Sequence, residues 1–360
     1  MSVDFVLRND EKAVFALRAL YGKYGYSQYK MSKFEEYDLY AGNKDFLVSE
    51  SVITFTDTDG KLMALKPDVT LSIIKNNKDN AKSITKVFYD ENVYRVSKGT
   101  KSYKEIMQAG LECLGDVDDF CINEVLTLAV KSLDSISKEF VLDVSSLDVI
   151  DGAMNDAKLS LSAKKEVLEF LSEKNLKGVK AVCIKEGVAN SAAELLEKLV
   201  TAYGAPEKVE NAICGCEFSE NTKRAIDKLL CTVKTIKKVT DCDNINVDFS
   251  VVNDLNYYNG IVFKGFISGI PTGILSGGQY DNLMDKMGRK SRAIGFAVYL
   301  DELTRLSADD GVDADVAVIY GTTCAEKVSM VVEDLINSGN SVIALKSLPE
   351  KLKVKKVVNL

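Results

Sequence analysis

The 360-residue chain contains no histidine and no tryptophan, and it has only four prolines. The absence of histidine excludes Ser-His-Asp and Cys-His catalytic sites, together with every metal site that needs an imidazole ligand. A protein made without histidine has an advantage when histidine is scarce. Chance explains the absence equally well, because tryptophan is missing too. The sequence leaves both explanations open.

The chain also lacks a positive balance of charge and long apolar segments. It has 46 Lys and Arg against 53 Asp and Glu, a formal net charge of −7 and a pI near 5.1. This balance offers no broad basic surface to a phosphate backbone and disfavours tRNA as a principal partner. No signal peptide precedes the charged start, and no apolar run reaches membrane-spanning length. We therefore expect a cytoplasmic protein with no membrane contact.

Eight cysteines are scattered through the chain without the spacing of a zinc site or a disulfide framework. The one close pair, Cys214 and Cys216, lacks the further cysteines or histidines that a tetrahedral zinc site needs. We expect reduced, mostly buried thiols, no bound metal and no cofactor. With 46% hydrophobic and 28% charged residues, the chain is long enough for one large domain with one or two smaller units.

Hydrophobic periodicity predicts a mixture of helices and strands in the first 150 residues. Asp10 opens a helix that Gly25 ends, and a turn at 57–60 joins two strands. Residues 83–95 predict a strand that pairs with the stretch after an exposed loop at 97–102. The other expected elements are strands at 46–55, 61–65 and 140–150 and helices at 69–76 and 119–137.

The composition changes between about residue 151 and residue 241, where Lys, Glu, Leu and Ala dominate and predict a helical insertion. Helix-period segments occupy 163–173, 191–203 and 222–235 within it. Strands at 246–249 and 260–268 follow, and a helix is predicted over 293–305. We expect one domain over residues 1–310. Residues 311–360 form a small α/β unit with strands at 314–320 and 341–345, a helix at 325–338 and a basic tail.

Five stretches resemble, in the right order, the catalytic domain of the class II aminoacyl-tRNA synthetases, and the histidyl-tRNA synthetase family in particular. The resemblance covers residues 10–305 and implies an α+β fold, an antiparallel sheet flanked by helices. It also implies a homodimer, because the first helix and the next strand form the dimer interface in that family. The C-terminal unit resembles a truncated anticodon-binding domain. The stretches are 65–70, 89–95 with 108–112, 254–259 with 262–263, 277–281 and 295–303.

The resemblance implies a binding pocket for a histidine molecule. Asp68 and Thr70 match residues that hold the ammonium group, and Gln108 matches an ammonium or carboxylate contact. Glu112 and Tyr258 match the pair that faces the imidazole, and Tyr280 matches a tyrosine that closes the pocket. These residue types suit a zwitterion with a ring that can carry charge, which needs carboxylate acceptors and aromatic walls.

The residues that activate the amino acid are partly replaced. Asn253 stands where the synthetases carry an arginine that helps to activate the histidine carboxylate, and Glu302 stands where an arginine clamps the triphosphate. A carboxylate in place of a guanidinium reverses the sign of the contact with phosphate. Arg95 matches the arginine of the second motif and is retained. We interpret these three positions as a vestigial nucleotide site with no catalytic residues.

A kept amino-acid pocket with lost adenylation residues is similar to a second family, the regulatory subunits of ATP phosphoribosyltransferase, which are paralogues of the synthetase. The resemblance implies a non-catalytic subunit that assembles with a short catalytic chain, activates it and takes part in its inhibition by histidine. The alternative is a histidine-adenylating ligase, which Arg95 supports. The histidine effector would bind either in the pocket or at the contact with the catalytic chain.

Overall fold

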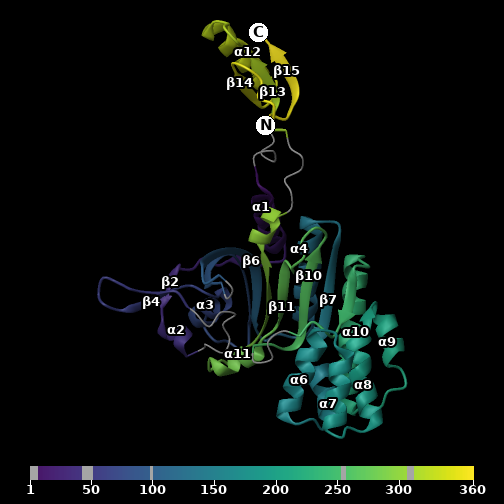
Figure 1. Cartoon of the computed structure of the whole chain (residues 1–360). Helices are drawn as coiled ribbons and strands as arrows, with labels where there is room; N and C mark the ends of the chain where they lie inside the picture. The colour runs from purple at the N-terminus through teal and green to yellow at the C-terminus, as the bar shows by residue number, and fades with distance from the viewer. Residues whose placement is uncertain (1–6, 43–51, 98–99, 253–256, 306–311) are drawn as a thin grey trace. The chain divides into compact units, whose positions relative to one another are not determined.

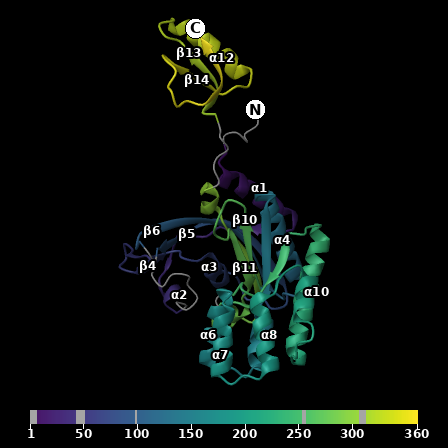
Figure 2. The same ribbon diagram turned by 45° about the vertical axis from the view of Figure 1, so that its right-hand side comes forward.

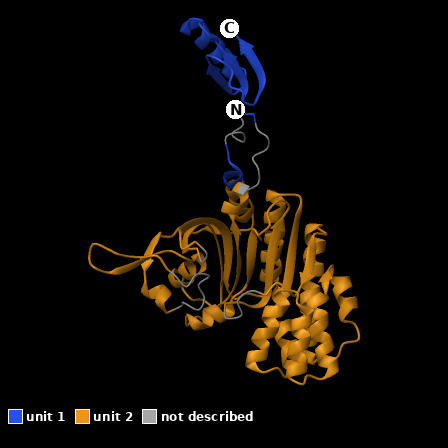
Figure 3. Ribbon diagram, in the orientation of Figure 1, with its two compact units in different colours: residues 1–12, 306–360 blue, residues 13–305 orange. Residues whose placement is uncertain are grey.

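The computed structural model describes residues 7–42, 52–97, 100–252, 257–305 and 312–360. The chain divides into two compact units, one of residues 13–305 and the other of residues 1–12 and 306–360 (Figure 3). The α+β class expected from the sequence is confirmed. The larger unit contains a nine-stranded and a three-stranded sheet, the smaller unit contains another three-stranded sheet, and the larger unit holds all the pocket residues that the structure describes.

A nine-stranded sheet forms the centre of the larger unit (Figure 1). Most neighbouring strands are antiparallel, as expected, whereas β1 pairs with β5 and β7 with β9 in parallel, so the sheet is mixed. The predicted strand pair around the 97–102 loop is confirmed as β5 and β6. In sheet order the strands are β1 (Ser27–Gln28), β5 (Ile84–Val96), β6 (Tyr103–Gly115), β12 (Arg292–Tyr299), β11 (Leu275–Gln279), β10 (Asn259–Ile267), β7 (Phe140–Ser146), β9 (Ile245–Asp248) and β8 (Tyr203–Gly204).

Two helices, α1 (Asn9–Lys23) and α4 (Asp119–Ile136), cover one face of this sheet. Tyr21 of α1 is fully buried between the rings of Phe88 and Phe296, with centroids 5.9 and 6.1 Å away. Its hydroxyl lies 3.0 Å from the Ser132 hydroxyl of α4. Because side chains alternate across a strand, the residues next to Phe88 and Phe296 face the opposite side of the sheet. That opposite side holds the candidate site.

Three short strands, two helices and a turn lie beside the C-terminal end of β5. The strands β2 (Phe34–Glu36), β4 (Leu62–Leu65) and β3 (Thr54–Thr56) form a separate sheet in that order. The predicted turn is confirmed, since Asp57 accepts hydrogen bonds from the amides of Asp59 and Lys61. The predicted helix at 69–76 is α3 (Val69–Asn76), and α2 (Asp38–Ala41) precedes it. Of the strand expected at 46–55, residues 46–51 lie outside the described residues.

The expected helical insertion is present and gathers at the β8–β9 end of the sheet (Figures 1 and 2). The strand predicted over 140–150 is too long, because residues 147–150 already form the first turn of α5 and bury Leu147, Val149 and Ile150 there. Two short helices, α7 and α9, escaped the prediction. The insertion comprises α5 (Leu147–Asp156), α6 (Leu161–Ser172), α7 (Leu176–Lys185), α8 (Asn190–Thr201), α9 (Pro206–Ile213) and α10 (Glu220–Thr240).

The helix predicted over 293–305 is wrong. Residues 292–299 form strand β12, and only Leu300–Arg305 turn into a short 3-10 helix. The reason is tertiary, since β12 lies between β6 and β11 and its apolar residues are buried on both faces of the sheet. A strand buried on both faces gives a continuous apolar run that periodicity does not distinguish from a helix. The helix that follows the glycine pair Gly277-Gly278 in the sequence is α11 (Asp281–Lys286), which precedes β12.

Residues 312–360 of the smaller unit form a three-stranded parallel sheet and one helix. Its strands lie in the order β14 (Val342–Leu345), β13 (Ala314–Ile319), β15 (Val354–Asn359), and α12 (Ala325–Asn337) connects β13 to β14. The tail expected after residue 345 is therefore partly a strand. Val354, Val357 and Val358 pair with β13 despite the lysines between them, because β-branched residues favour a strand wherever a neighbour offers pairing.

A capping residue offers a test of the helix that supports the sheet. Asp118 precedes α4 and accepts a 2.9 Å hydrogen bond from the amide of Cys121. Asp118→Ala should lower the free energy of unfolding by about 1 kcal/mol, because an amide of the first turn loses its partner. Asp134→Ala, which removes an exposed carboxylate from the same helix, is the control and should change stability by less than about 0.5 kcal/mol. Equal effects in urea denaturation would contradict the capping role.

Candidate amino-acid site

The centre of the site is Glu112 on β6, on the face of the sheet opposite α1 and α4. Its side chain is 2% exposed. One carboxylate oxygen accepts a 2.7 Å hydrogen bond from the Thr70 hydroxyl, and the other accepts a 2.6 Å bond from the Tyr280 hydroxyl. Burial raises the pKa of Glu112 to about 8, and the negative charge of Asp68 adds to this, whereas the two hydroxyl bonds lower it.

A second carboxylate, Asp68, lies at the junction between β4 and α3. It caps α3 by accepting a 2.9 Å hydrogen bond from the amide of Leu71. Its other oxygen lies 4.0 Å from the guanidinium of Arg95, and Arg95 also donates to the carbonyl of Pro67 at 3.0 Å. Burial raises the pKa of Asp68, and Arg95 opposes that shift. The arginine is thus held beside the acid that precedes α3.

Tyrosine rings surround the two carboxylates. Tyr257 lies between Tyr258 and Tyr280, with ring centroids 4.5 and 6.0 Å away. Tyr89 on β5 is buried on the same face as Glu112. Burial raises the pKa of all these phenols well above the usual value, so the hydroxyls remain protonated. They supply an apolar wall with hydrogen-bonding groups that carry no charge.

Glycines in the central strands give these side chains room to lie against the sheet. Gly295 of β12 pairs with Glu112, and a Cβ at that position would come within 1.7 Å of the glutamate oxygen. A Cβ at Gly110 would come within 2.5 Å of the Tyr89 hydroxyl, and one at Gly278 within 2.9 Å of the Tyr258 ring. Three neighbouring strands therefore lack side chains where the pocket residues lie.

Gln108 completes the set of predicted pocket residues. It lies on β6 four residues before Glu112 and faces the same side of the sheet, opposite Tyr299. The side chain is 4% exposed, and its amide makes no hydrogen bond to another residue in the described parts of the chain. A buried amide without a protein partner is available to a ligand.

The structure brings the predicted pocket residues to one face of the sheet and adds others that the sequence analysis missed. Thr70, Glu112 and Tyr280 are joined by hydrogen bonds, and Asp68 adjoins them through α3. Tyr89, Tyr257 and Gly295 were not predicted. The alternation of β5 could have indicated Tyr89, and the pairing of Tyr257 with Tyr258 in the sequence could have indicated an aromatic wall. Nothing in the sequence alone indicated that Gly295 lies against Glu112.

The three positions of the predicted vestigial nucleotide site differ in their surroundings and in whether the structure describes them. Asn253 lies outside the described residues. Glu302 is in the short 3-10 helix after β12, and its carboxylate accepts a 3.0 Å hydrogen bond from the hydroxyl of Thr272. Arg95 points to Asp68 and Pro67, as described above. The carboxylate of Glu302 is therefore held by a hydrogen bond to the loop that precedes β11.

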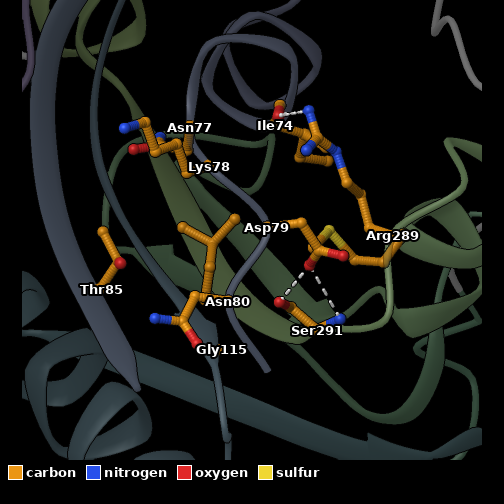
Figure 4. A pocket seen from close by; sticks show the side chains of 11 residues that line it. Ile74, Asn77, Lys78, Asp79, Asn80, Thr85, Gly115, Arg289 and Ser291 are labelled. Atoms are coloured by element: carbon orange, nitrogen blue, oxygen red, sulfur yellow. Dashed lines mark hydrogen bonds between the residues drawn. The ribbon is translucent and has the colours of Figure 1, made fainter. Parts of the chain in front are cut away.

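A small cavity on the other side of α3 has a structural role (Figure 4). Its volume of about 10 Å³ has room for one water molecule. Arg289 donates to the carbonyl of Ile74 at 2.9 Å, and Asp79 accepts from the amides of Lys290 and Ser291 at 2.9 and 3.2 Å. These contacts join the C-terminal end of α3 to the loop before β12 and help to fix the helix that carries Thr70.

The described residues bear on three other kinds of site. Across the described parts of the chain, no three His, Cys, Asp or Glu side chains converge as a metal site would require. The described helices include none that is both long and apolar enough to cross a membrane. Of the eight cysteines, three are buried (Cys113, Cys121 and Cys183), two are half-buried (Cys216 and Cys242) and three are exposed (Cys214, Cys231 and Cys324), so the expectation of mostly buried thiols is wrong.

Comparison with known proteins identifies the family. Residues 6–303 match the family model described as histidyl-tRNA synthetase. An ATP phosphoribosyltransferase regulatory subunit from Thermoanaerobacter pseudethanolicus is 30% identical over 291 residues, 79% of this chain and 75% of the relative. The chain belongs to the histidyl-tRNA synthetase family, among the ATP phosphoribosyltransferase regulatory subunits. A regulatory subunit from Ruminiclostridium cellulolyticum is 25% identical over 319 residues, 87% of this chain and 76% of the relative.

Solved structures of the family share the fold. A Bacillus halodurans protein described as an ATP phosphoribosyltransferase regulatory subunit/histidyl-tRNA synthetase has a TM-score of 0.74 and 18% identity over 98% of this chain and 93% of its own. A chain of the ATP phosphoribosyl transferase (HisG:HisZ) complex from Thermotoga maritima has a TM-score of 0.64 and 17% identity, covering 81% of this chain and 97% of its own. Regulatory subunits thus retain the synthetase fold.

A glycine substitution tests the packing of the site. Gly295→Ala should lower the free energy of unfolding by about 1–3 kcal/mol, because the new methyl group displaces the Glu112 carboxylate and the carbonyl of Leu111. Gly22→Ala is the control. Gly22 lies in α1 with nothing within 4 Å of an added Cβ, so alanine there should leave stability unchanged or raise it by up to about 1 kcal/mol. Chemical denaturation of both variants provides the measurement.

The buried carboxyl of Glu112 makes stability depend on pH. Its folded-state pKa of about 8 exceeds the ordinary value of 4.5, so the folded state retains a proton that the unfolded state loses across that range. The wild type should therefore lose stability, relative to Glu112→Gln, as pH rises from about 4.5 to about 8, with no further divergence above that range. Denaturation of both proteins at several pH values measures the difference. A constant difference would show that Glu112 is already ionised in the fold.

Proposed function

We propose that this chain is the non-catalytic regulatory subunit of a short-form ATP phosphoribosyltransferase. It assembles with the catalytic subunit, activates the first step of histidine biosynthesis and takes part in feedback inhibition by histidine. The observation that carries this proposal is the buried hydrogen-bonded cluster around Glu112, which matches an amino-acid pocket by resemblance, combined with a carboxylate, Glu302, at the position that matches the triphosphate-binding arginine. The regulatory-subunit relatives support the partner.

Histidine fits the pocket group by group. Its ammonium is placed at Asp68 and Thr70, and its carboxylate is placed toward Arg95 and the buried amide of Gln108. The imidazole then meets Glu112, with the rings of Tyr258 and Tyr280 as walls. Each polar group of the ligand thereby meets a group of complementary charge or hydrogen-bonding capacity, which a buried site requires.

The same geometry argues against adenylation. The transition state of adenylate formation gathers negative charge on phosphate oxygens, which enzymes stabilise with cations. Glu302 adds a negative charge at the triphosphate position and is held by Thr272. Arg95 favours the alternative, a histidine-adenylating ligase, but it does not remove the negative charge that Glu302 adds at the triphosphate position. Histidine-dependent exchange of pyrophosphate into ATP tests this alternative directly.

We further propose a homodimer within the hetero-oligomer and no role for tRNA. The family relation supports the dimer, since the helix α1 and the strand after it form the family's dimer interface. The net charge of −7 and the interspersed ion pairs of the insertion argue against a phosphate-binding face. The insertion helices are better suited to solvent or to a protein contact.

The deciding experiment measures the condensation of ATP with phosphoribosyl pyrophosphate by a short catalytic subunit from the same genome. We expect little activity from the catalytic subunit alone, a faster rate when this protein is added, and a lower rate when histidine is added to the pair. In the presence of Glu112→Gln the pair should remain active and lose its response to histidine. Glu210→Gln, an exposed change on α9, is the matched control and should retain that response.

Two results would contradict parts of the proposal, and a third would establish the alternative. Failure of the two chains to form a complex, with no change of rate, would remove the regulatory role. Inhibition by histidine that is identical for the wild type and Glu112→Gln would leave the regulatory role in place and move the effector site to the contact between the subunits. Pyrophosphate exchange by this protein alone would establish the ligase.

A further inference from the structure

The charges of the pocket do not balance in the absence of a ligand. Two buried carboxylates, Asp68 and Glu112, share the pocket with one cation, Arg95. The guanidinium lies beside Asp68 and donates to the carbonyl of Pro67. Within the described residues, no Lys or Arg lies within ion-pair distance of Glu112. The partners of Glu112 are two neutral hydroxyl groups.

The groups that face Glu112 come from every element around it, and apart from Asp68 and Arg95 they are neutral. The phenols keep their protons because burial raises the pKa of each. The facing groups are Asp68 just before α3 and Thr70 within it, Tyr89 and Arg95 from β5, Gln108 from β6 itself, Tyr257 and Tyr258 before β10, Tyr280 before α11, and Gly295 and Tyr299 from β12.

An isolated buried carboxylate is costly in its charged form, and the cost is removed when it takes up a proton. The hydroxyl groups of Thr70 and Tyr280 allow this, because a hydroxyl donates to a carboxylate and can instead accept from a carboxylic acid. Glu112 therefore keeps both hydrogen bonds whether it is ionised or protonated. Its pKa near 8 agrees with a protonated side chain in the empty pocket at neutral pH.

We propose that Glu112 and the ring of bound histidine together hold a single proton. This inference rests on the proposed function. With the ammonium at Asp68 and the carboxylate at Arg95, those four charges cancel. If Glu112 and the imidazole held two protons, the pair would carry a buried positive charge. If they held none, the pair would carry a buried negative charge. One proton gives a neutral pair or an ion pair, both of which a dry pocket tolerates.

The requirement for a single shared proton determines how the affinity for histidine depends on pH. Below the ring pKa of about 6.5, free histidine and Glu112 each carry a proton, and one proton must leave when they combine. Above about 8 neither carries one, and a proton must be taken up. Affinity should therefore be highest between these values and fall about tenfold per pH unit on either side. Histidine would be sensed most strongly near neutral pH.

The test is calorimetric titration of the full-length protein with histidine across the pH range of both limbs. The wild type should show both limbs. Glu112→Gln should keep the acidic limb, which belongs to the ring, and should lose the part of the alkaline limb that Glu112 contributes. Any alkaline limb from the ligand's own ammonium remains in both proteins and is subtracted by the comparison. Glu210→Gln should match the wild type at every pH.

A second ligand tests the rule without a variant, in case Glu112→Gln does not fold. In 1,2,4-triazolylalanine the ring is a much weaker base than imidazole and is neutral when free. With the wild type, this probe should lose the acidic limb and retain the alkaline limb. Proton uptake is measured independently by titrating in two buffers of different ionisation enthalpy above pH 8.

Each outcome decides the proposal. Histidine binding with the same alkaline limb in the wild type and Glu112→Gln, or an acidic limb that persists with the triazole, would overturn the shared proton and leave the proposed function intact. Failure of the wild type to bind histidine at any pH would overturn both the shared proton and the assignment of the effector to this pocket. Both limbs, altered as described, would establish it.

Discussion

The antiparallel ladder between β5 and β6 is the constraint on which the rest of the larger unit depends. It pairs thirteen residues of each strand without interruption, from Ile84 with Gly115 to Val96 with Tyr103. The uninterrupted register fixes which side chains share a face over the whole length of the pair. Tyr89, Gln108 and Glu112 consequently face the pocket, while their sequence neighbours pack under α1 and α4.

The other elements of the site are positioned relative to this pair of strands. β12 pairs with β6 and presents Gly295 to Glu112, so the bare backbone of one strand accommodates the carboxylate of the next. α3 brings Thr70 to the same carboxylate from the opposite direction, and its far end is held by Arg289. The positions of these groups are therefore set by the backbone and by hydrogen bonds that already exist, which lowers the ordering that binding of a ligand would require.

Local sequence was sufficient for the parts of the molecule in which one physical rule dominates. The turn at Gly60, the start of α3 at Asp68 and the alternation of β5 follow from turn chemistry, capping and period. Prediction failed where tertiary contacts decide between two patterns. Residues 293–299 read as a helix because β12 is buried on both faces, and residues 354–359 read as a tail until pairing with β13 makes them a strand.

The pocket was predicted from a family resemblance, and its energetics could not have been. The sequence named Glu112 and Tyr280 as neighbours of one ligand. It did not indicate that they bond to each other, or that the nearest cation lies beside Asp68 instead of Glu112. Those properties depend on burial and on distances across the sheet, and the bond between Glu112 and Tyr280 joins residues that lie 168 positions apart in the sequence. Charge balance in a site is a property of the fold.

The double use of Asp68 limits how this pocket can change in evolution. One oxygen of its carboxylate begins α3 by capping Leu71, and the other faces Arg95. Serine, threonine and asparagine would keep the cap and discard the charge. Such a substitution would leave α3 begun at the same residue and would leave Arg95 without its carboxylate partner. The start of the helix and the charge of the site can therefore be separated by a single change at position 68.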